Sequence, residues 1–147
     1  MKDFDSIDEV LDFAISREIE AHTFYTELTE VVEKADLRQV LGEFAADELN
    51  HKVKLEALKA GRTMIRPEEI GSLGIANSVE AVESGPNMTY VETLVIGMKK
   101  EKRAYKLYVD LARMAQTEKI RKLFLLLAQE EANHKLQLEI EYDLETF

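Results

Sequence analysis

Two short stretches of this 147-residue chain place a glutamate three residues before a histidine. They run from Glu48 to His51 and from Glu131 to His134, and they stand 83 positions apart. On an α-helix this separation is close to one turn, so carboxylate and imidazole leave the same face about 4.5 Å apart along the axis. Two ligands of one metal ion have this geometry, so the spacing predicts a metal-binding pair in each stretch. Surface Glu and His on two amphipathic helices are the alternative interpretation.

The shift of 83 positions relates much more of the chain than these two pairs. In each half a further glutamate stands 30 residues before the Glu of the pair, Glu18 in the first half and Glu101 in the second. Unrelated helical segments rarely agree at so many positions, so the agreement indicates an internal repeat. Other identical positions include Ala21/Ala104, Tyr25/Tyr108, Leu28/Leu111, Arg38/Arg121, Ala45/Ala128, Asn50/Asn133, Lys52/Lys135 and Leu55/Leu138.

Apolar residues at helical spacing predict the four elements that must position these side chains. Ser6 with Glu9, and Thr89 with Glu92, have the spacing of capping boxes and begin the first and third helices. The joins within each half are short, so its two helices should lie antiparallel. A stretch rich in Gly and Pro separates the halves and is long enough to cross the length of a helix. We predict a single all-α domain over residues 1–147, a ferritin-like four-helix bundle with helices at about 6–33, 36–60, 89–116 and 118–143 and a long crossover at 61–87.

Composition excludes several classes of function. The 19 basic and 29 acidic residues give a net charge of −10, which disfavours nucleic acid or an anionic membrane surface as partner. There is no Cys, so disulfides, thiolate metal sites and thiol catalysis are excluded within these residues, and any metal must be held by oxygen and nitrogen. The first residues contain no apolar signal region, and no stretch approaches the ~18 apolar residues of a membrane span. We expect a cytoplasmic protein.

The four predicted helices together offer four glutamates and two histidines, the ligand set known from ferritin-like carboxylate bundles. Four carboxylates in an apolar bundle carry four negative charges, and burying them without compensation would cost several kcal/mol each. Two divalent ions would cancel that charge. A pair of metal ions can exchange two electrons, so the site suits two-electron chemistry. Oxygen-rich ligands with one imidazole per metal suit iron or manganese, although zinc binds comparable sites more tightly.

The repeated Glu-x-x-Ala-x-x-x-Tyr and Asp/Glu-Glu-x-x-His patterns resemble those of the rubrerythrin family, di-iron members of the ferritin-like superfamily, across all four helices. The resemblance implies a bundle, often dimeric, that reacts with hydrogen peroxide or dioxygen in oxidative stress and draws electrons from a rubredoxin-like donor. It implies two bound iron ions, with Glu48 and Glu131 as bridging carboxylates. The full set of implied metal ligands is Glu18, Glu48, His51, Glu101, Glu131 and His134.

Two features differ from the rubrerythrin pattern. Rubrerythrins have an extra glutamate one turn before the third-helix ligand, which exchanges with a histidine as the iron changes oxidation state, and Met98 stands at that position here. They also usually carry a Cys-rich rubredoxin domain, whereas this sequence has no Cys. Electrons must therefore come from another protein or from a small reductant.

Four further side chains are candidates for supporting the ligands. Tyr25 and Tyr108 lie two turns beyond the lone glutamates, so their hydroxyls could bond and orient the bridging carboxylates. The alternative is that they are ordinary core aromatics at helical spacing. Asp47 and Glu130 precede the bridging glutamates and could hold the second ring nitrogen of a ligand histidine, unless they are exposed carboxylates.

Two other residues on the first helix are less suitable as ligands. His22 is one turn after Glu18, but the repeat places Tyr105 at the corresponding position, which favours a structural or surface role for His22. Glu20 is a rival to Glu18, yet the repeat maps it onto Arg103.

Three functions are compatible with this site. The leading hypothesis is a rubrerythrin-like peroxidase or oxidase that reduces hydrogen peroxide or dioxygen with electrons from an external donor. A ferroxidase is the second hypothesis. The third is a non-enzymatic bundle that binds iron in order to sense or buffer it.

Overall fold

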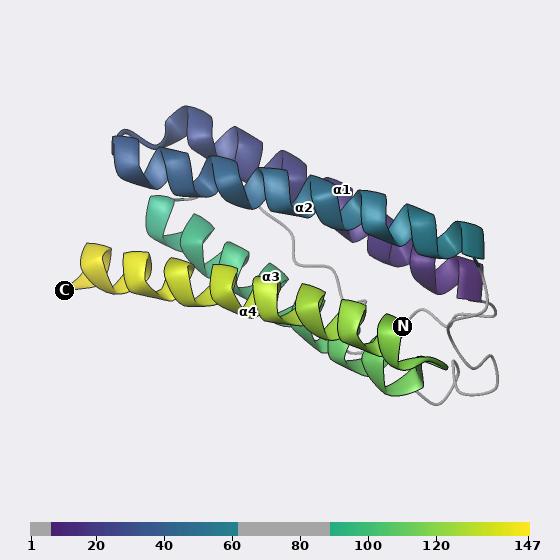
Figure 1. The fold of residues 1–147 in the computed structure, drawn as a ribbon. Helices are drawn as coiled ribbons and strands as arrows, with labels where there is room; N and C mark the ends of the chain where they lie inside the picture. Colours follow the sequence, from purple (N-terminus) through teal and green to yellow (C-terminus); the bar gives the residue numbers. More distant parts are fainter. Residues whose placement is uncertain (1–6, 62–88) are drawn as a thin grey trace. The chain divides into compact units, whose positions relative to one another are not determined.

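Four α-helices account for nearly all of the described residues, which are 7–61 and 89–147 of a computed structural model. In Figure 1 the chain runs through α1 (Ile7–Val31), α2 (Ala35–Gly61), α3 (Tyr90–Met114) and α4 (Glu118–Thr146). Each helix begins and ends within three residues of the predicted bounds. The sequence predicts the crossover at 61–87, but Gly61 is the last residue of α2. The rest of the predicted crossover and Ser6 of the first capping box lie outside the described residues.

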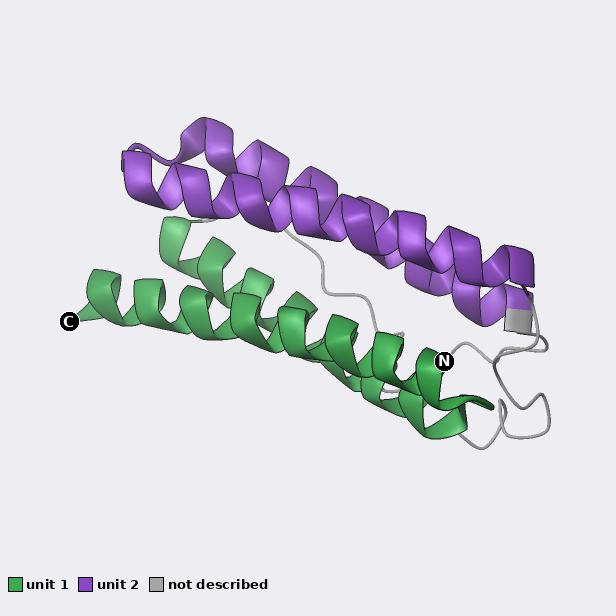
Figure 2. Cartoon of the chain, in the orientation of Figure 1, with its two compact units in different colours: residues 1–3, 65–147 green, residues 4–64 purple. Residues whose placement is uncertain are grey.

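The helices fall into two compact units, one built from α1 and α2 and the other from α3 and α4 (Figure 2). In each unit the two helices pack on one another along their length. A join of only a few residues connects them, so each unit is an antiparallel helical hairpin. Each hairpin corresponds to one copy of the sequence repeat. That the whole chain forms a single domain stays a prediction.

Side-chain caps explain where the helices of the second hairpin begin. The Thr89 hydroxyl accepts a hydrogen bond of 3.1 Å from the backbone N–H of Glu92 and lies 3.1 Å from its carboxylate. The bond from the Glu92 N–H is one of the two bonds of the capping box expected from the sequence, and the Glu92 carboxylate contacts the Thr89 hydroxyl. Thr117 caps α4 in the same position, since its hydroxyl accepts from the N–H of Ile120 at 3.2 Å. Both caps satisfy backbone donors that a helix leaves without intrahelical partners.

An arginine side chain stabilises the turn between the two helices of the first hairpin. The Arg38 guanidinium donates two hydrogen bonds, of 2.8 and 3.2 Å, to the carbonyl oxygen of Val32, just beyond the end of α1. Val32 itself is buried, so its carbonyl has little access to water. The charged donor therefore satisfies a backbone acceptor at the turn and ties the start of α2 to the end of α1.

The core of each hairpin is an apolar stripe with one aromatic pair near its middle. In the first hairpin the buried ring of Tyr25 meets Phe44 edge to face at 5.3 Å between centroids. In the second, Tyr108 stacks on Phe124 at 6.4 Å. These pairs join the two helices of each hairpin and fix their register.

Candidate metal centre

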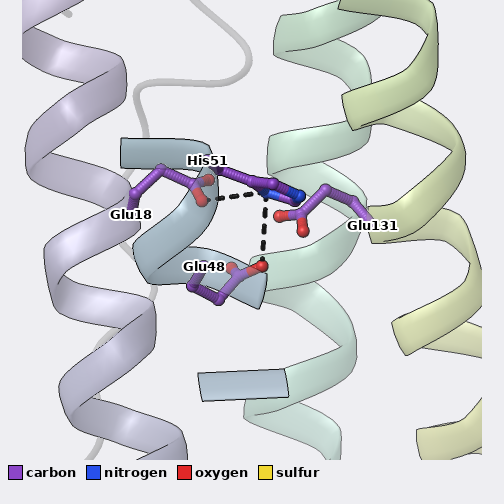
Figure 3. A group of neighbouring side chains, drawn as sticks. All are labelled: Glu18, Glu48, His51 and Glu131. Atoms are coloured by element: carbon purple, nitrogen blue, oxygen red, sulfur yellow. Dashed lines mark ion pairs between the residues drawn. The ribbon is translucent and has the colours of Figure 1, made fainter. Parts of the chain in front are cut away.

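The first hairpin brings together Glu18 from α1 with Glu48 and His51 from α2. All three are buried, with exposed fractions of 1, 1 and 0 %. The Nδ1 atom of His51 lies 3.0 Å from Oε2 of Glu18 and 3.6 Å from Oε1 of Glu48, as the dashed lines in Figure 3 mark. We call Glu18, Glu48 and His51 the first triad.

The second hairpin repeats the arrangement with Glu101 from α3 and Glu131 and His134 from α4. Their exposed fractions are 1, 1 and 3 %. The Nδ1 atom of His134 lies 3.6 Å from Oε1 of Glu101 and 3.6 Å from Oε1 of Glu131. These residues are the second triad. Each hairpin therefore brings its three predicted ligands together by itself.

The ligand positions belong to the buried stripe of the helices that carry them. On α2 the buried positions are Leu41, Phe44, Ala45, Glu48, His51, Leu55 and Leu58, and α4 buries the positions 83 residues later. Steps of three and four residues keep such a series on one helix face. The apolar residues on both sides bury the face, and the Glu and His between them are carried into the interior with it. The packing of the apolar neighbours thus buries polar side chains that would otherwise favour water.

The charge of each triad favours a bound cation as a fourth component. Two carboxylates and one neutral imidazole carry a formal charge of −2, and protonating the imidazole still leaves −1. Burying net charge is costly unless a counter-charge accompanies it. One divalent ion for each triad balances the two carboxylates and uses the imidazole as a neutral ligand.

The spacing within each triad fits a shared metal ion. One ligand atom from each of the three residues can be chosen so that all lie within 4.8 Å of one another. Two ligand atoms about 2.1 Å from one metal stand roughly 3.0 to 3.6 Å apart at angles between ~90 and ~120°. The distances from Nδ1 to the carboxylates are in this range. The donor set, two oxygens for each nitrogen, suits iron or manganese.

The tyrosines proposed to orient the bridging carboxylates, Tyr25 and Tyr108, are among the most buried side chains, with exposed fractions of 0 and 1 %. Their ring contacts with Phe44 and Phe124 show that both are core aromatics. A bond from either hydroxyl to a bridging carboxylate stays a prediction. The two interpretations from the sequence are compatible, since a packed ring can still direct its hydroxyl.

Two residues near Glu18 have structural roles instead of ligand roles. His22 donates from Nδ1 to the carbonyl oxygen of Ala45 at 2.8 Å, a bond between α1 and α2. The structural role expected for His22 is thus confirmed. Glu20 is exposed and forms an ion pair of 2.9 Å with Arg17, whereas Glu18 is buried. Burial agrees with the choice of Glu18 over Glu20.

Three remaining positions from the sequence are intermediate in burial. Asp47 and Glu130, next to the bridging candidates, are partly buried, and their suggested bonds to the ligand histidines stay predictions. Met98, at the position of the extra glutamate of rubrerythrins, is also partly buried. Its thioether is a weak ligand for a hard ferric ion, so it does not replace a carboxylate there.

The sequence interpretation missed a buried tyrosine–glutamate pair. The Tyr90 hydroxyl donates to Oε1 of Glu141 at 3.3 Å, and Glu141 has an exposed fraction of only 8 %. Burial, followed by the charge of Glu141 and the hydrogen bond to it, raises the pKa of Tyr90 well above its ordinary value of 10.0. Tyr90 stands eleven residues before Glu101, so it follows the ligand face of α3, a spacing that could have identified it.

Comparisons with known proteins agree with the site. A family model described as Rubrerythrin matches residues 9–142. A solved structure of a hypothetical protein from Pyrococcus furiosus is similar at 26% sequence identity and a TM-score of 0.73, covering 95% of this chain and 89% of that chain. No curated protein matches. Among the described helices, none has the length and apolar character that crossing a membrane requires.

Proposed function

Because this chain belongs to the rubrerythrin family, we propose that its two triads together form one di-iron centre that reduces hydrogen peroxide or dioxygen. The same membership confirms the predicted fold class, an all-α ferritin-like four-helix bundle. The observation that carries the proposal is the burial of two matching triads, each with two carboxylates and one imidazole. The repeat supports pairing them, since two equivalent half-sites supply one ligand set to two metals.

We infer the roles of the six ligands from the resemblance to the rubrerythrin family. Glu18 and Glu101 act as terminal ligands, His51 and His134 each supply one neutral nitrogen, and Glu48 and Glu131 bridge. When bound, the iron pair supplies the two electrons that the reduction of one hydrogen peroxide to water consumes. Burial among packed side chains restricts the movement of the ligand residues, which would limit the reorganisation that metal binding requires.

The apolar residues around the triads restrict access of water to the centre. Tyr25 and Tyr108 cover the ligand face two turns from the terminal glutamates, and both are fully enclosed. Small uncharged oxidants can enter such a site more readily than ions, for which desolvation is costly. This selectivity fits hydrogen peroxide and dioxygen as substrates.

Electrons must come from outside these residues, because the chain contains no Cys with which to bind a thiolate-held iron donor. We propose a rubredoxin-like protein as the donor and a homodimer as the working form. A reduced donor is most readily available in the cytoplasm, which is the compartment we propose. Manganese or zinc are the alternative metals for the same ligands.

Metal content tests this proposal first. The protein is loaded anaerobically with ferrous iron, and bound iron is measured for the native chain, for Glu131→Ala and for the control Glu20→Ala. We expect two irons per chain in the native protein and in the control, because Glu20 is exposed and paired with Arg17. Glu131→Ala should bind one or none. Native protein without stoichiometric iron would refute the di-iron centre.

Kinetics then separates the peroxidase from its alternatives. The loaded protein is given hydrogen peroxide and a reduced rubredoxin, and donor oxidation is followed over many turnovers. Continued consumption of both supports an oxidoreductase. Oxidation that occurs once and then stops with every donor would instead indicate a ferroxidase or a protein that buffers iron.

A further inference from the structure

A groove of about 470 Å³ runs along the outer surface of the second hairpin, between α3 and α4. From α3 it is lined by Lys102, Tyr105 and Lys106, and from α4 by Lys135 and Glu139 among others. Tyr105 is 42 % exposed, so its ring is available at the surface of the groove for contact with a partner.

The groove is basic on a chain that is acidic overall. Residues 99–106 contain five of the 19 basic residues, and their one acidic residue is the buried ligand Glu101. In the groove itself, Glu139 is engaged by Lys135 at 2.9 Å. Lys102 and Lys106 are both exposed and add two positive charges beyond that pair. A positive surface stands out against a net charge of −10 and attracts an anionic partner.

Lys102 and Lys106 have no basic counterpart in the first half of the repeat. Lys135 and Glu139 correspond to Lys52 and Glu56, which form a similar ion pair of 3.4 Å on the first hairpin. Lys102 and Lys106 instead correspond to Ile19 and Thr23, which carry no charge. At the corresponding described positions the first hairpin therefore lacks these two charges, although both hairpins carry a triad.

The groove lies at the level of the second triad. Lys102 follows Glu101 directly, and Lys135 follows His134 directly. In each pair the ligand is buried and its neighbour points toward the outer surface. A helix is about 10 Å thick with its side chains, so this surface is separated from the ligands by roughly one helix. Among surfaces of this hairpin, it offers a short route for an electron.

We propose that this groove is the docking site for the acidic face of a small one-electron donor protein, an inference that rests on the proposed function. Lys102 and Lys106 attract carboxylates of the donor, and Tyr105 provides the central contact. Each hydrogen peroxide takes two electrons and two protons to give two waters, so two donor molecules dock for each turnover. Such redox encounters bury small interfaces, below ~1,200 Å², and depend on charge complementarity.

An acidic protein fits this surface better than a nucleic acid does. Nucleic acid binding needs several phosphate contacts spread along a surface. The groove offers two uncompensated lysines and one aromatic ring within a single turn of α3. This is a local site for a compact, transient partner.

The test compares two double variants with the same change in charge. Lys102→Glu with Lys106→Glu reverses the groove, and Lys119→Glu with Lys122→Glu reverses two exposed lysines near the start of α4. The probe is a reduced rubredoxin of net negative charge, and stopped-flow absorbance gives its second-order oxidation rate with hydrogen peroxide in excess. We expect at least a ~10-fold loss for the groove variant and less than a ~2-fold loss for the control at low salt. Added salt should slow the native protein, because it screens the attraction, and should not slow the groove variant, whose carboxylates repel the acidic donor.

Further measurements separate this inference from the proposed function. A neutral quinol, which needs no charged docking site, should reduce native protein and both variants at equal rates. If no reductant supports turnover, the proposed function fails, and docking is then tested by titrating rubredoxin and measuring chemical shifts. Shifts confined to the groove and lost in its variant support the inference. The inference would be overturned if both variants lost the same fraction of the rubredoxin oxidation rate or if neither lost any. It would also be overturned if a duplex DNA displaced rubredoxin.

Discussion

The Nδ1 atom of His51 lies 3.0 Å from Oε2 of Glu18, although the two residues stand on different helices. The same pairing recurs between His134 and Glu101, at 3.6 Å. In each hairpin the histidine is therefore shared between a glutamate one turn away and a glutamate on the neighbouring helix. A metal ion bound by these atoms would link the two helices of each hairpin, so the stability of each hairpin would depend on metal binding.

Chelation should therefore lower the stability of the loaded protein. Metal that binds only the folded chain stabilises it by ~2.7 kcal/mol when the free metal is 100 times the dissociation constant. Glu18→Gln, which removes one charge and keeps the shape, should lose most of this dependence on metal. Urea unfolding with and without chelator measures both effects, with Glu20→Gln as the control. Equal metal dependence in Glu18→Gln and the native protein would contradict the role of Glu18.

The sequence predicted the helices and the ligand candidates because both depend on short-range periodicity. Glu48 and His51 share a helix face whatever the surrounding fold, and the repeat then points to Glu18 and Glu101. Their burial in the structure agrees with that interpretation. Whether all six bind metal stays a prediction.

Features that depend on pairing between helices could not be predicted in the same way. Tyr90 and Glu141 are 51 residues apart, and neither is repeated in the first half, where Ile7 and Leu58 stand instead. The lysine groove likewise requires knowing which face of α3 lies beside which face of α4. Sequence periodicity gives the face of one helix, and only packing selects the partner face.

His22→Ala should weaken the first hairpin without affecting metal binding. The change removes the bond from Nδ1 to the carbonyl of Ala45, 2.8 Å long and partly buried, and leaves that carbonyl without this donor. A loss of about 1–2 kcal/mol in the free energy of unfolding is expected. Urea unfolding of the metal-free protein measures it, and the iron content after loading should remain native. A lower iron content would instead make His22 part of the metal site.

Arg38→Ala and Arg121→Ala should differ although the two arginines occupy the same position of the repeat. Arg38 is exposed, but its two hydrogen bonds satisfy the carbonyl of the buried residue Val32, so its loss should cost about 1–2 kcal/mol. Arg121 bonds the exposed carboxylate of Glu118 one turn away, and its loss should leave the unfolding midpoint nearly unchanged. The two midpoints in urea decide the comparison, and equal effects would contradict the assigned roles.

Tyr90→Phe should change how stability depends on pH above 10. Burial is the largest cause of the raised pKa of Tyr90, and the charges of Glu141 and Glu145 add to it. Above pH ~10 the unfolded chain releases the phenol proton while the folded chain keeps it. The stabilisation is therefore complete below pH 10 and is lost as the pH rises toward the folded-state pKa.

The free energy of unfolding should fall with pH by at most ~1.4 kcal/mol per pH unit, and solvent around the half-buried ring reduces this slope. Urea unfolding between pH 8 and 11 should show a shallower decline for Tyr90→Phe than for the native chain. At pH 7 this variant should lose only about 1 kcal/mol, the contribution of one hydrogen bond. Glu141→Gln removes a charge beside Tyr90 and leaves Tyr90 buried to the same extent. Its slope should therefore lie between those of the native chain and Tyr90→Phe. If all three chains decline in parallel, Tyr90 does not keep its proton in the folded state as the contact with Glu141 requires.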